Sequence, residues 1–272
     1  EKTTFGELIE RYLREVTPLM RGAKADSIRL KAIMRRPIAK ENLASLTPSK
    51  IAKYRDERLL EIAPSTVVRE LTYFSSIINH ARREWGINVP NPVQMVRKPQ
   101  SPQARSRVLT GEEVEKLLQA LEPTGRRSHW TKPIVQLALA TAMRRGELLS
   151  LRWEHVDLQN RTAFLSDTKN GESRTVPLSN AAVQVLAALP RHISGVVIPV
   201  KFFTLDAAFK RALKRSGLDD VRFHDLRRTA ITRMAEKLPN VIELAAVSGH
   251  KSLMVLKRYY RPAASELAQK LG

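Results

Sequence analysis

The chain has 272 residues, of which 47 are lysine or arginine and 27 are aspartate or glutamate, so its formal net charge is +20. Its length suggests two domains, and a charge of this size indicates a polyanionic partner, most commonly nucleic acid. Cysteine is absent, which excludes disulfides, thiolate zinc sites and cysteine nucleophiles.

Positive charge is spread over both halves of the chain. Residues 1–100 carry a formal net charge of +8, and the remainder carries +12. We therefore expect both halves to contact the polyanion, as the two jaws of a clamp would. Charge alone leaves open the alternative of a merely basic protein, such as a ribosomal one.

Targeting and metal-binding patterns are absent from the sequence. No stretch reaches about 18 consecutive apolar residues, so no membrane span is expected, and the first residues show no signal-peptide pattern. The six histidines are scattered without HExxH spacing and no acidic cluster is visible, so neither a metal nor another cofactor is expected. The lack of cysteine fits a cytoplasmic location.

Residues 1–98 predict a small helical domain. The sequence from Thr4 to Glu7 has the capping-box pattern that begins a helix, and Thr47 before a proline predicts another helix start. The last helix of the domain carries an apolar stripe at helical spacing and should end at Gly86. We expect four or five helices in this domain.

Residues 99–106 predict a basic linker between the two domains. The stretch contains two prolines and one arginine, follows directly on Arg97-Lys98 and has few apolar residues, so it should be extended and solvated. Such a linker is suited to running along a phosphate backbone, and a plain hinge is an equally good interpretation.

Residues 107–272 predict a second, mainly helical domain with a small antiparallel β-sheet. The β-prone runs 162–165 and 175–178 flank Asn170-Gly171, and this dipeptide between two short strands is typical of a hairpin. The chain from 179 onward reads as helices broken at prolines and glycines.

A strand transfer on DNA without a metal would require a particular set of side chains. Charge builds up on the non-bridging phosphate oxygens in the transition state, so fixed cations must surround them. Arginine suits this role because its planar guanidinium matches two oxygens at once. A hydroxyl nucleophile, and an acid to protonate the leaving alkoxide, complete the set.

The first candidate is Arg144. Residues 132–152 predict a buried helical segment that Arg144 and Arg145 interrupt, and charges there are costly unless they are paired or face a ligand. Glu147 lies three residues after Arg144 and should share its helix face. Taken alone, this stretch is better explained by a purely structural arginine–glutamate pair.

Two further stretches contain the remaining candidates. His224 and Arg227 are three residues apart and should project from one side of a helix. His250 follows a glycine, and Tyr259 comes nine residues later within a basic run, where positive charge favours the phenolate. Taken singly, each has an ordinary interpretation, because helix-surface pairs and half-buried tyrosines such as the Tyr259-Tyr260 pair are common.

Taken together in this order, the motifs resemble the tyrosine recombinase, or phage integrase, family. They are TAMRRGELL around Arg144, TKNG followed by RTVPL on the hairpin, HDLR, GH, and a tyrosine nine residues after the last histidine. The match runs from about Arg107 to Tyr260, and the preceding helical domain and linker resemble the family's core-binding domain. Ala142 and Ser248 stand where members often have glycine and leucine, which are small departures.

The resemblance implies a catalytic set consisting of Arg144, Lys169, His224, Arg227, His250 and Tyr259. Arg144 and Arg227 would clamp the scissile phosphate, and His250 would donate a hydrogen bond to a non-bridging oxygen. His224 would assist proton transfer.

The resemblance also assigns the nucleophile and the acid. Lys169, at the hairpin tip, would protonate the leaving 5′-oxygen, and Tyr259 would attack phosphorus to form a 3′-phosphotyrosyl intermediate. One phosphoester replaces another, so neither ATP nor a metal is needed. Tyr259 is preferred to Tyr260 because of the nine-residue step from His250, and neighbours on a helix point about 100° apart.

The implied protein is a site-specific DNA recombinase of a mobile genetic element, acting on double-stranded DNA as a homotetramer, with accessory DNA-bending proteins as possible partners. Two alternatives are a type IB topoisomerase, which has the same catalytic set, and a DNA-binding protein with an inactive site. The target sequence, and the choice among integration, excision and resolution, cannot be read from these residues. We also expect that an arm-binding domain can precede residue 1, and that 263–271 forms a short helix.

Overall fold

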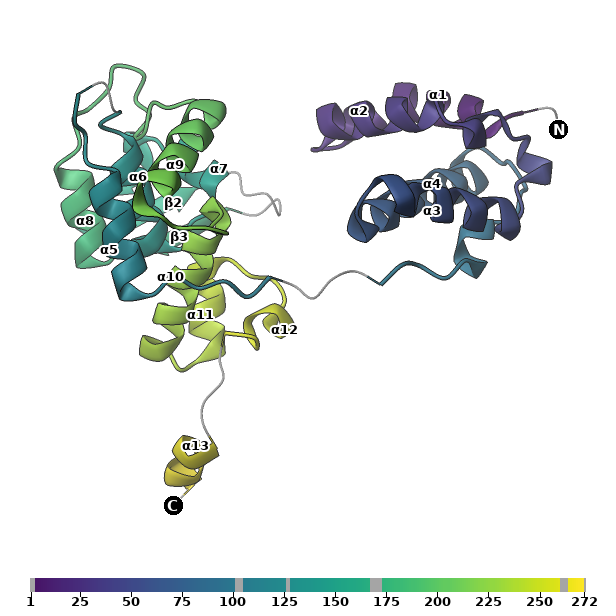
Figure 1. Ribbon diagram of the computed structural model, residues 1–272. Coiled ribbons are helices and arrows are strands. Elements are labelled where there is room, and N and C mark those ends of the chain that lie inside the picture. Colours follow the sequence, from purple (N-terminus) through teal and green to yellow (C-terminus); the bar gives the residue numbers. More distant parts are fainter. Residues whose placement is uncertain (1–2, 101–104, 126–127, 167–172, 260–263, 272) are drawn as a thin grey trace. The chain divides into compact units, whose positions relative to one another are not determined.

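The chain forms two compact units, residues 1–104 and 105–272, which are described separately. The computed structural model (Figure 1) describes residues 3–100, 105–125, 128–166, 173–259 and 264–271. Lys169 and Tyr260 therefore lie outside the described residues. Within the described residues, no helix is long and apolar enough to cross a membrane.

Unit 1 is helical throughout its described part. Its long helices are α1 (Phe5–Glu15), α2 (Ala23–Met34), α3 (Pro48–Glu61) and α4 (Pro64–Glu84). Short 3₁₀ turns at Thr17–Leu19, Pro37–Lys40, Leu43–Ser45 and Pro92–Met95 connect or follow them.

Local sequence signals explain where the helices of unit 1 begin and end. The Thr4 hydroxyl accepts a hydrogen bond from the Glu7 backbone N–H (3.2 Å), and the Glu7 carboxylate accepts one from the Thr4 N–H (2.7 Å). This is the predicted capping box, and it satisfies two amides that would otherwise lack partners. Helix α4 ends at Trp85, and Gly86 follows with a φ of +65°, a conformation that glycine adopts without strain.

The core of unit 1 combines an aromatic cluster with a buried ion pair. The rings of Phe5 and Tyr54 lie 4.8 and 4.9 Å from the ring of Phe74. Beside them, the Glu70 carboxylate accepts hydrogen bonds from Arg58 Nε (2.9 Å), Arg58 Nη2 (2.7 Å) and the Tyr54 hydroxyl (2.7 Å). Helices α3 and α4 are thus joined by apolar packing and by the Glu70 carboxylate, both of whose oxygens accept hydrogen bonds from α3.

Unit 2 is mainly helical with one small antiparallel sheet. Its elements are α5 (Gly111–Ala120), α6 (Thr131–Thr141), α7 (Arg145–Ser150), a 3₁₀ turn (Trp153–His155), β1 (Val156–Asp157), β2 (Thr162–Leu165), β3 (Arg174–Pro177), α8 (Asn180–Ala187), α9 (Phe202–Ser216), α10 (Phe223–Lys237), α11 (Val241–Ser248), α12 (Leu253–Leu256) and α13 (Ala264–Leu271). The strand order is β1-β2-β3, and β2 pairs with β3 so that Ala163 faces Val176. The predicted fold class, mainly α with a small antiparallel sheet, is confirmed.

The segment 132–152, predicted as one buried helical stretch, is two helices. Helix α6 ends at Thr141, and Ala142 takes a left-handed conformation with a φ of 54°. Ala142 is completely buried, and its amide still bonds back to Ala138. The chain then turns, and α7 begins at Arg145. Hydropathy alone misses this break, because both helices bury apolar residues.

Two hydrophobic clusters hold unit 2 together. The larger one includes Leu117 of α5, Ile134 of α6, Val176 of β3 and Leu205 of α9, each fully buried. The smaller cluster joins the left-handed turn to the C-terminal helices through Ala142, Ala230, Ile231, Ala235, Leu244 and Leu256, with Tyr259 packed against it. This second cluster brings α10, α11 and α12 to the break between α6 and α7.

Candidate active site

Arg144 is the N-cap residue of α7, directly after the left-handed turn. Its backbone N–H donates to Oε2 of Glu147 (2.8 Å), and its guanidinium Nη1 donates to Oε1 of the same carboxylate (2.8 Å). Its other terminal nitrogen, Nη2, donates to the carbonyl of Gly249 (3.1 Å). Sequence spacing predicted the partner correctly but for the wrong reason, because the two residues are joined across a helix start rather than along a helix face.

Arg227 is the most deeply buried of the candidate cations, with 3% of its surface exposed. Its guanidinium donates to the carbonyl of Ser248 (2.6 Å) and to the carbonyl of Ala142. Burial, followed by the positive charge of Arg144, lowers its pKa to about 10. The guanidinium groups of Arg144 and Arg227 therefore repel each other. Each donates a hydrogen bond to a neutral backbone carbonyl of the segment Ser248-Gly249.

His250 follows the turn that both arginines hold. Helix α11 ends at Gly249, whose φ of +67° reverses the chain and presents the imidazole. Nδ1 of His250 lies 2.8 Å from the Ser248 hydroxyl, and that hydroxyl donates to the Leu244 carbonyl (2.6 Å). Burial, followed by the charges of Arg227 and Arg144, lowers the pKa of His250 to about 4, so the ring is neutral at pH 7.

His224 and Tyr259 lie at the edges of this cluster. His224 is exposed in the first turn of α10, three residues before the buried Arg227. Partial loss of hydration, followed by the charges of Arg227 and Arg228, lowers its pKa. Tyr259 is half-buried, and its ring centre lies 6.4 Å from that of His250.

The structure thus brings together Arg144, Arg227, His250 and Tyr259, with His224 beside Arg227. Arg145 is directed elsewhere: it pairs with Asp206 (2.9 Å) and stacks 3.6 Å above the Phe202 ring. The choice between Tyr259 and Tyr260 and the position of Lys169 stay predictions, because neither Lys169 nor Tyr260 is among the described residues.

Sequence analysis missed one residue of this cluster, Arg174. It is the first residue of β3, and its Nη1 and Nη2 donate to Oε1 and Oε2 of Glu147, both at 2.9 Å. Glu147 is 5% exposed. Burial alone would raise its pKa, but the hydrogen bonds from Arg174 and Arg144 outweigh that effect and hold the pKa below its ordinary value. The only sequence signal was an arginine after the hairpin turn, in the RTVPL stretch.

The charge of this cluster suits an anion rather than a metal cation. The guanidinium groups of Arg144 and Arg174 pair with the Glu147 carboxylate, and that of Arg227 lies close enough to feel the charges of all three. Across the described residues, no group of three or more potential metal ligands is found. An anion with two or more oxygens, such as a phosphodiester, matches the surplus charge and the planar donors.

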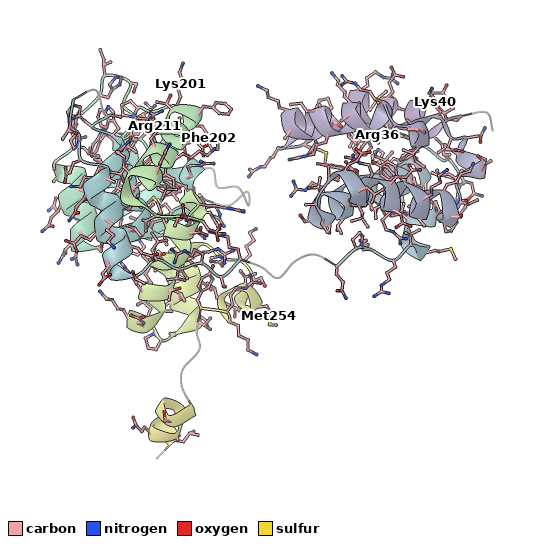
Figure 2. The ribbon with its side chains drawn as sticks, in the orientation of Figure 1. Arg36, Lys40, Lys201, Phe202, Arg211 and Met254 are labelled. Carbon is pink, nitrogen blue, oxygen red and sulfur yellow. The ribbon has the colours of Figure 1, made fainter. Side chains whose placement is uncertain are left out.

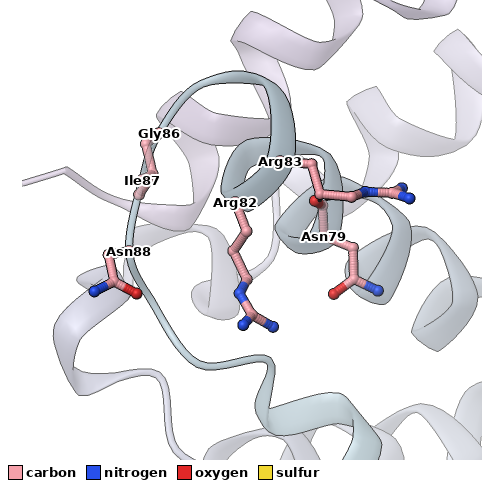
Figure 3. A pocket seen from close by; sticks show the side chains of 6 residues that line it. All are labelled: Asn79, Arg82, Arg83, Gly86, Ile87 and Asn88. Atoms are coloured by element: carbon pink, nitrogen blue, oxygen red, sulfur yellow. Dashed lines mark hydrogen bonds between the residues drawn. The ribbon is translucent and has the colours of Figure 1, made fainter.

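Basic side chains outside the cluster extend the surface that a polyanion could contact. In unit 2, the basic residues Lys201 and Arg211 are exposed on or next to α9, as is the aromatic Phe202. All three lie in the upper part of the unit in Figure 2. In unit 1, an open depression of about 570 Å³ lies at the end of α4, lined by Asn79, Arg82, Arg83, Gly86, Ile87 and Asn88. The Arg82 guanidinium extends into the space below the loop that carries Gly86 and Asn88 (Figure 3).

Comparisons with known proteins agree with this arrangement. Residues 107–266 match the phage integrase family and residues 1–99 match the phage integrase N-terminal domain. The chain is 40% identical to a shufflon-specific DNA recombinase of Escherichia coli, over 99% of this chain and 72% of that protein. It is 36% identical to a putative integrase/recombinase of Haemophilus influenzae, over 97% of this chain and 74% of that protein.

Solved structures show the same fold at lower identity. The Tn1549 transposon integrase in complex with a circular intermediate DNA superposes with a TM-score of 0.82 at 16% identity, covering 99% of both chains. A lambda integrase dimer bound to a COC′ core site gives 0.77 at 24% identity, covering 95% of this chain and 77% of that one. The chain therefore belongs to the phage integrase family, the tyrosine recombinases.

Proposed function

We propose that this protein is a site-specific DNA recombinase that cleaves and rejoins strands through a 3′-phosphotyrosyl intermediate, without metal or ATP. One observation carries the proposal. Arg144 and Arg227 come from different helices, yet they donate to the consecutive carbonyls of Gly249 and Ser248, next to His250. Two guanidinium groups and an imidazole are thereby held at one place, beside the half-buried Tyr259.

Electrostatics supports a phosphodiester as the ligand of this site. Burial, followed by the charge of Arg144, lowers the pKa of Arg227 despite the opposing charge of Glu147, which supports a positive charge that its protein neighbours only partly balance. A phosphate oxygen at the cluster would supply the missing negative charge. Because charge on the non-bridging oxygens rises in the transition state, preorganised guanidiniums stabilise that state more than the ground state.

The proposed reaction keeps bonds and charges balanced. The Tyr259 oxygen attacks phosphorus, a bond from that oxygen to phosphorus forms, and the bond from phosphorus to the 5′-oxygen breaks. Lys169 would give its proton to the leaving 5′-oxygen, and His224 would assist the transfer of the proton that the Tyr259 hydroxyl loses. Arg144, Arg227 and His250 would hold the non-bridging oxygens. Attack by a free 5′-hydroxyl of a partner strand then reverses the step, so no external energy source is needed.

The partner is proposed to be double-stranded DNA carrying recombination sites. A net charge of +20 spread over both units suits a protein that grips a duplex from two sides. A related lambda integrase has been solved as a tetramer bound to a Holliday junction. We infer that this protein also assembles as a homotetramer on DNA, in the cytoplasm where such DNA is found, with DNA-bending proteins as accessory partners.

The test is covalent trapping on a nicked suicide duplex, from which the cleaved fragment diffuses away and leaves the protein attached. Duplexes would first be selected by the protein from a random library. Wild type and Tyr260→Phe should form a denaturation-resistant adduct in EDTA without ATP, and Tyr259→Phe should form none. Adduct in the Tyr259→Phe variant would refute the nucleophile assignment. Sequence-independent relaxation of a supercoiled plasmid would favour a topoisomerase, and binding without adduct would indicate an inactive site.

A further inference from the structure

We propose that Arg174 is a positioning residue, which clamps Glu147 and so fixes the direction of Arg144 and the turn before His250. This inference rests on the proposed DNA cleavage, and it extends that proposal to a residue outside the expected catalytic set. Arg174 stands at the start of β3, immediately after the hairpin loop, where Leu165 of β2 is its partner in the sheet.

The first argument is the geometry of the shared carboxylate. Oε1 of Glu147 accepts from Arg174 Nη1 (2.9 Å) and Arg144 Nη1 (2.8 Å), whereas Oε2 accepts from Arg174 Nη2 (2.9 Å) and the Arg144 backbone N–H (2.8 Å). Without Arg174, Oε1 of Glu147 would be held only by the flexible side chain of Arg144. The planar, two-pronged contact from Arg174 fixes the plane of the carboxylate. Arg144 is aligned against that plane.

The second argument is the contact between Arg174 and the turn at Gly249. A Cβ atom built on Gly249 would lie only 2.6 Å from Cζ and Nη1 of Arg174, so the guanidinium occupies the space that a side chain would need. Gly249 also provides the carbonyl that accepts from Arg144 (3.1 Å) and directly precedes His250. One side chain thus contacts both the partner of Arg144 and the turn that presents the histidine.

The third argument is that neither substrate contact nor stability explains Arg174. Both terminal nitrogens of Arg174 donate to the same carboxylate, so the two-pronged face of its guanidinium is directed at Glu147 rather than at a phosphate. Its side chain is 13% exposed, and among the described residues its Nε finds no hydrogen-bond partner. A buried ion pair with an unsatisfied donor contributes little to folding, because desolvation offsets the attraction. The remaining role is to hold geometry.

The experiment compares single-turnover cleavage of two duplexes that differ only at the scissile phosphate. One carries the ordinary phosphodiester, and the other a methylphosphonate, in which a methyl group replaces one non-bridging oxygen and the charge is lost. Arg174→Ala should slow cleavage of the phosphodiester by about 10- to 100-fold, as expected for the loss of a supporting contact. On the methylphosphonate the same variant should be within a few-fold of wild type, because Arg144 is no longer needed to neutralise a charge.

Three further variants make the readout specific. Arg174→Lys keeps the charge but not the fork, so it should stay impaired on the phosphodiester. Arg144→Ala combined with Arg174→Ala should be no slower than Arg144→Ala alone, because both changes remove one function. The matched control is Arg191→Ala, which removes an exposed positive charge elsewhere in unit 2 and should leave both rates unchanged.

A second route keeps the proposal testable if Arg174→Ala fails to fold. Gly249→Ala displaces the guanidinium without removing its charge, and Gly217→Ala is its control, because Gly217 has a similar φ of +65° with nothing within 4 Å of the added Cβ. Gly249→Ala should reproduce the defect that the methylphosphonate relieves, and Gly217→Ala should not.

The outcomes separate the two proposals. Equal slowing on both duplexes, with additive effects in the double variant, would overturn the positioning role while leaving DNA cleavage intact. If wild type forms no covalent adduct at all, the proposed function fails, and this inference fails with it. A substrate-dependent defect in both Arg174→Ala and Gly249→Ala would support the positioning role.

Discussion

Each unit of this protein buries a carboxylate held by arginine, but the two networks differ in their charge balance. In unit 1, Arg36 and Arg58 pair with Glu61 and Glu70, so the charges cancel. In unit 2, Arg144, Arg174 and Arg227 lie around Glu147, the one carboxylate that the described residues place among them. A network that balances itself is complete without a ligand, whereas a surplus of buried positive charge is costly until an anion arrives.

The pKa of one arginine in each network expresses this difference. Hydrogen bonds that Arg58 donates to Glu70 raise the pKa of Arg58 above its usual value despite burial. For Arg227, burial and the charge of Arg144 lower the pKa to about 10. The charged form is therefore stabilised by its partner in unit 1 and destabilised by its surroundings in unit 2. We infer that the first network maintains the fold and that the second is arranged for binding and catalysis.

The largest expected effect is that of Arg227→Gln on the rate of cleavage, and it tests the contrast between the two networks. Removing a preorganised cation from the phosphate site should slow single-turnover cleavage by about 100- to 1,000-fold. The urea midpoint of unfolding should change little, because the lost hydrogen bonds to Ala142 and Ser248 are offset by relief of repulsion from Arg144. A variant that cleaves normally but unfolds much more easily would show that Arg227 is structural.

The second prediction concerns the stability of unit 1 rather than the rate of cleavage. Glu70→Ala leaves the Arg58 guanidinium and the Tyr54 hydroxyl buried without their acceptor, so it should lower the free energy of unfolding of unit 1 by about 3–5 kcal/mol. Calorimetry should then show one thermal transition shifted downward. The control is Glu57→Ala, an exposed residue of the neighbouring helix α3, and it should shift the transition only slightly. Equal shifts in both variants would contradict a structural role for the balanced network.

The parts that sequence analysis predicted correctly depend on short-range signals. The capping box at Thr4 involves residues three apart, and α1 begins where this box predicts. The hairpin runs are also confirmed, because β2 spans Thr162–Leu165 and β3 begins one residue before the predicted run. Strand β1 was missed because two residues carry too little alternation to be recognised.

The parts that were missed depend on contacts between distant residues. The left-handed Ala142 is held by burial in a cluster with α10 and α11, and alanine gives no signal for that conformation. The role of Arg174 requires Glu147, 27 residues earlier in the chain. Family resemblance identified the residues that are proposed to contact phosphate, but the resemblance did not indicate which side chains hold them in place.

The smallest predicted effect concerns the protonation of His250. The Ser248 hydroxyl gives its hydrogen to the Leu244 carbonyl, so it must accept one from Nδ1, and we assign the proton of the neutral ring to Nδ1. Nε2 is then an acceptor, and His250 can donate to a phosphate oxygen only after it takes up a second proton. The charges of Arg227 and Arg144 oppose that uptake until an anion neutralises them.

The free energy of unfolding should therefore decrease as the pH is lowered through a defined window. The unfolded chain binds a proton on this histidine near pH 6.5, but the folded chain does so only near pH 4, where the pKa of His250 lies. Between these values the unfolded state holds more protons, so lowering the pH from 7 to 5 should reduce the free energy of unfolding of unit 2. The lowered pKa of His224 acts in the same direction.

The matched variant for this effect is His250→Gln, which cannot titrate. Its free energy of unfolding, measured in urea, should fall less than that of wild type between pH 7 and pH 5, and the difference should be of order 1 kcal/mol or less at this partly exposed site. Carboxylates titrate mainly below this range and contribute little to the difference. Binding of a phosphodiester duplex should also take up about one proton in wild type and fewer in the variant, as measured by calorimetry in two buffers of different ionisation enthalpy. If the two proteins show the same pH slope and the same proton uptake, His250 is not the group that senses the phosphate charge, and its proposed donation to a non-bridging oxygen would have to be abandoned.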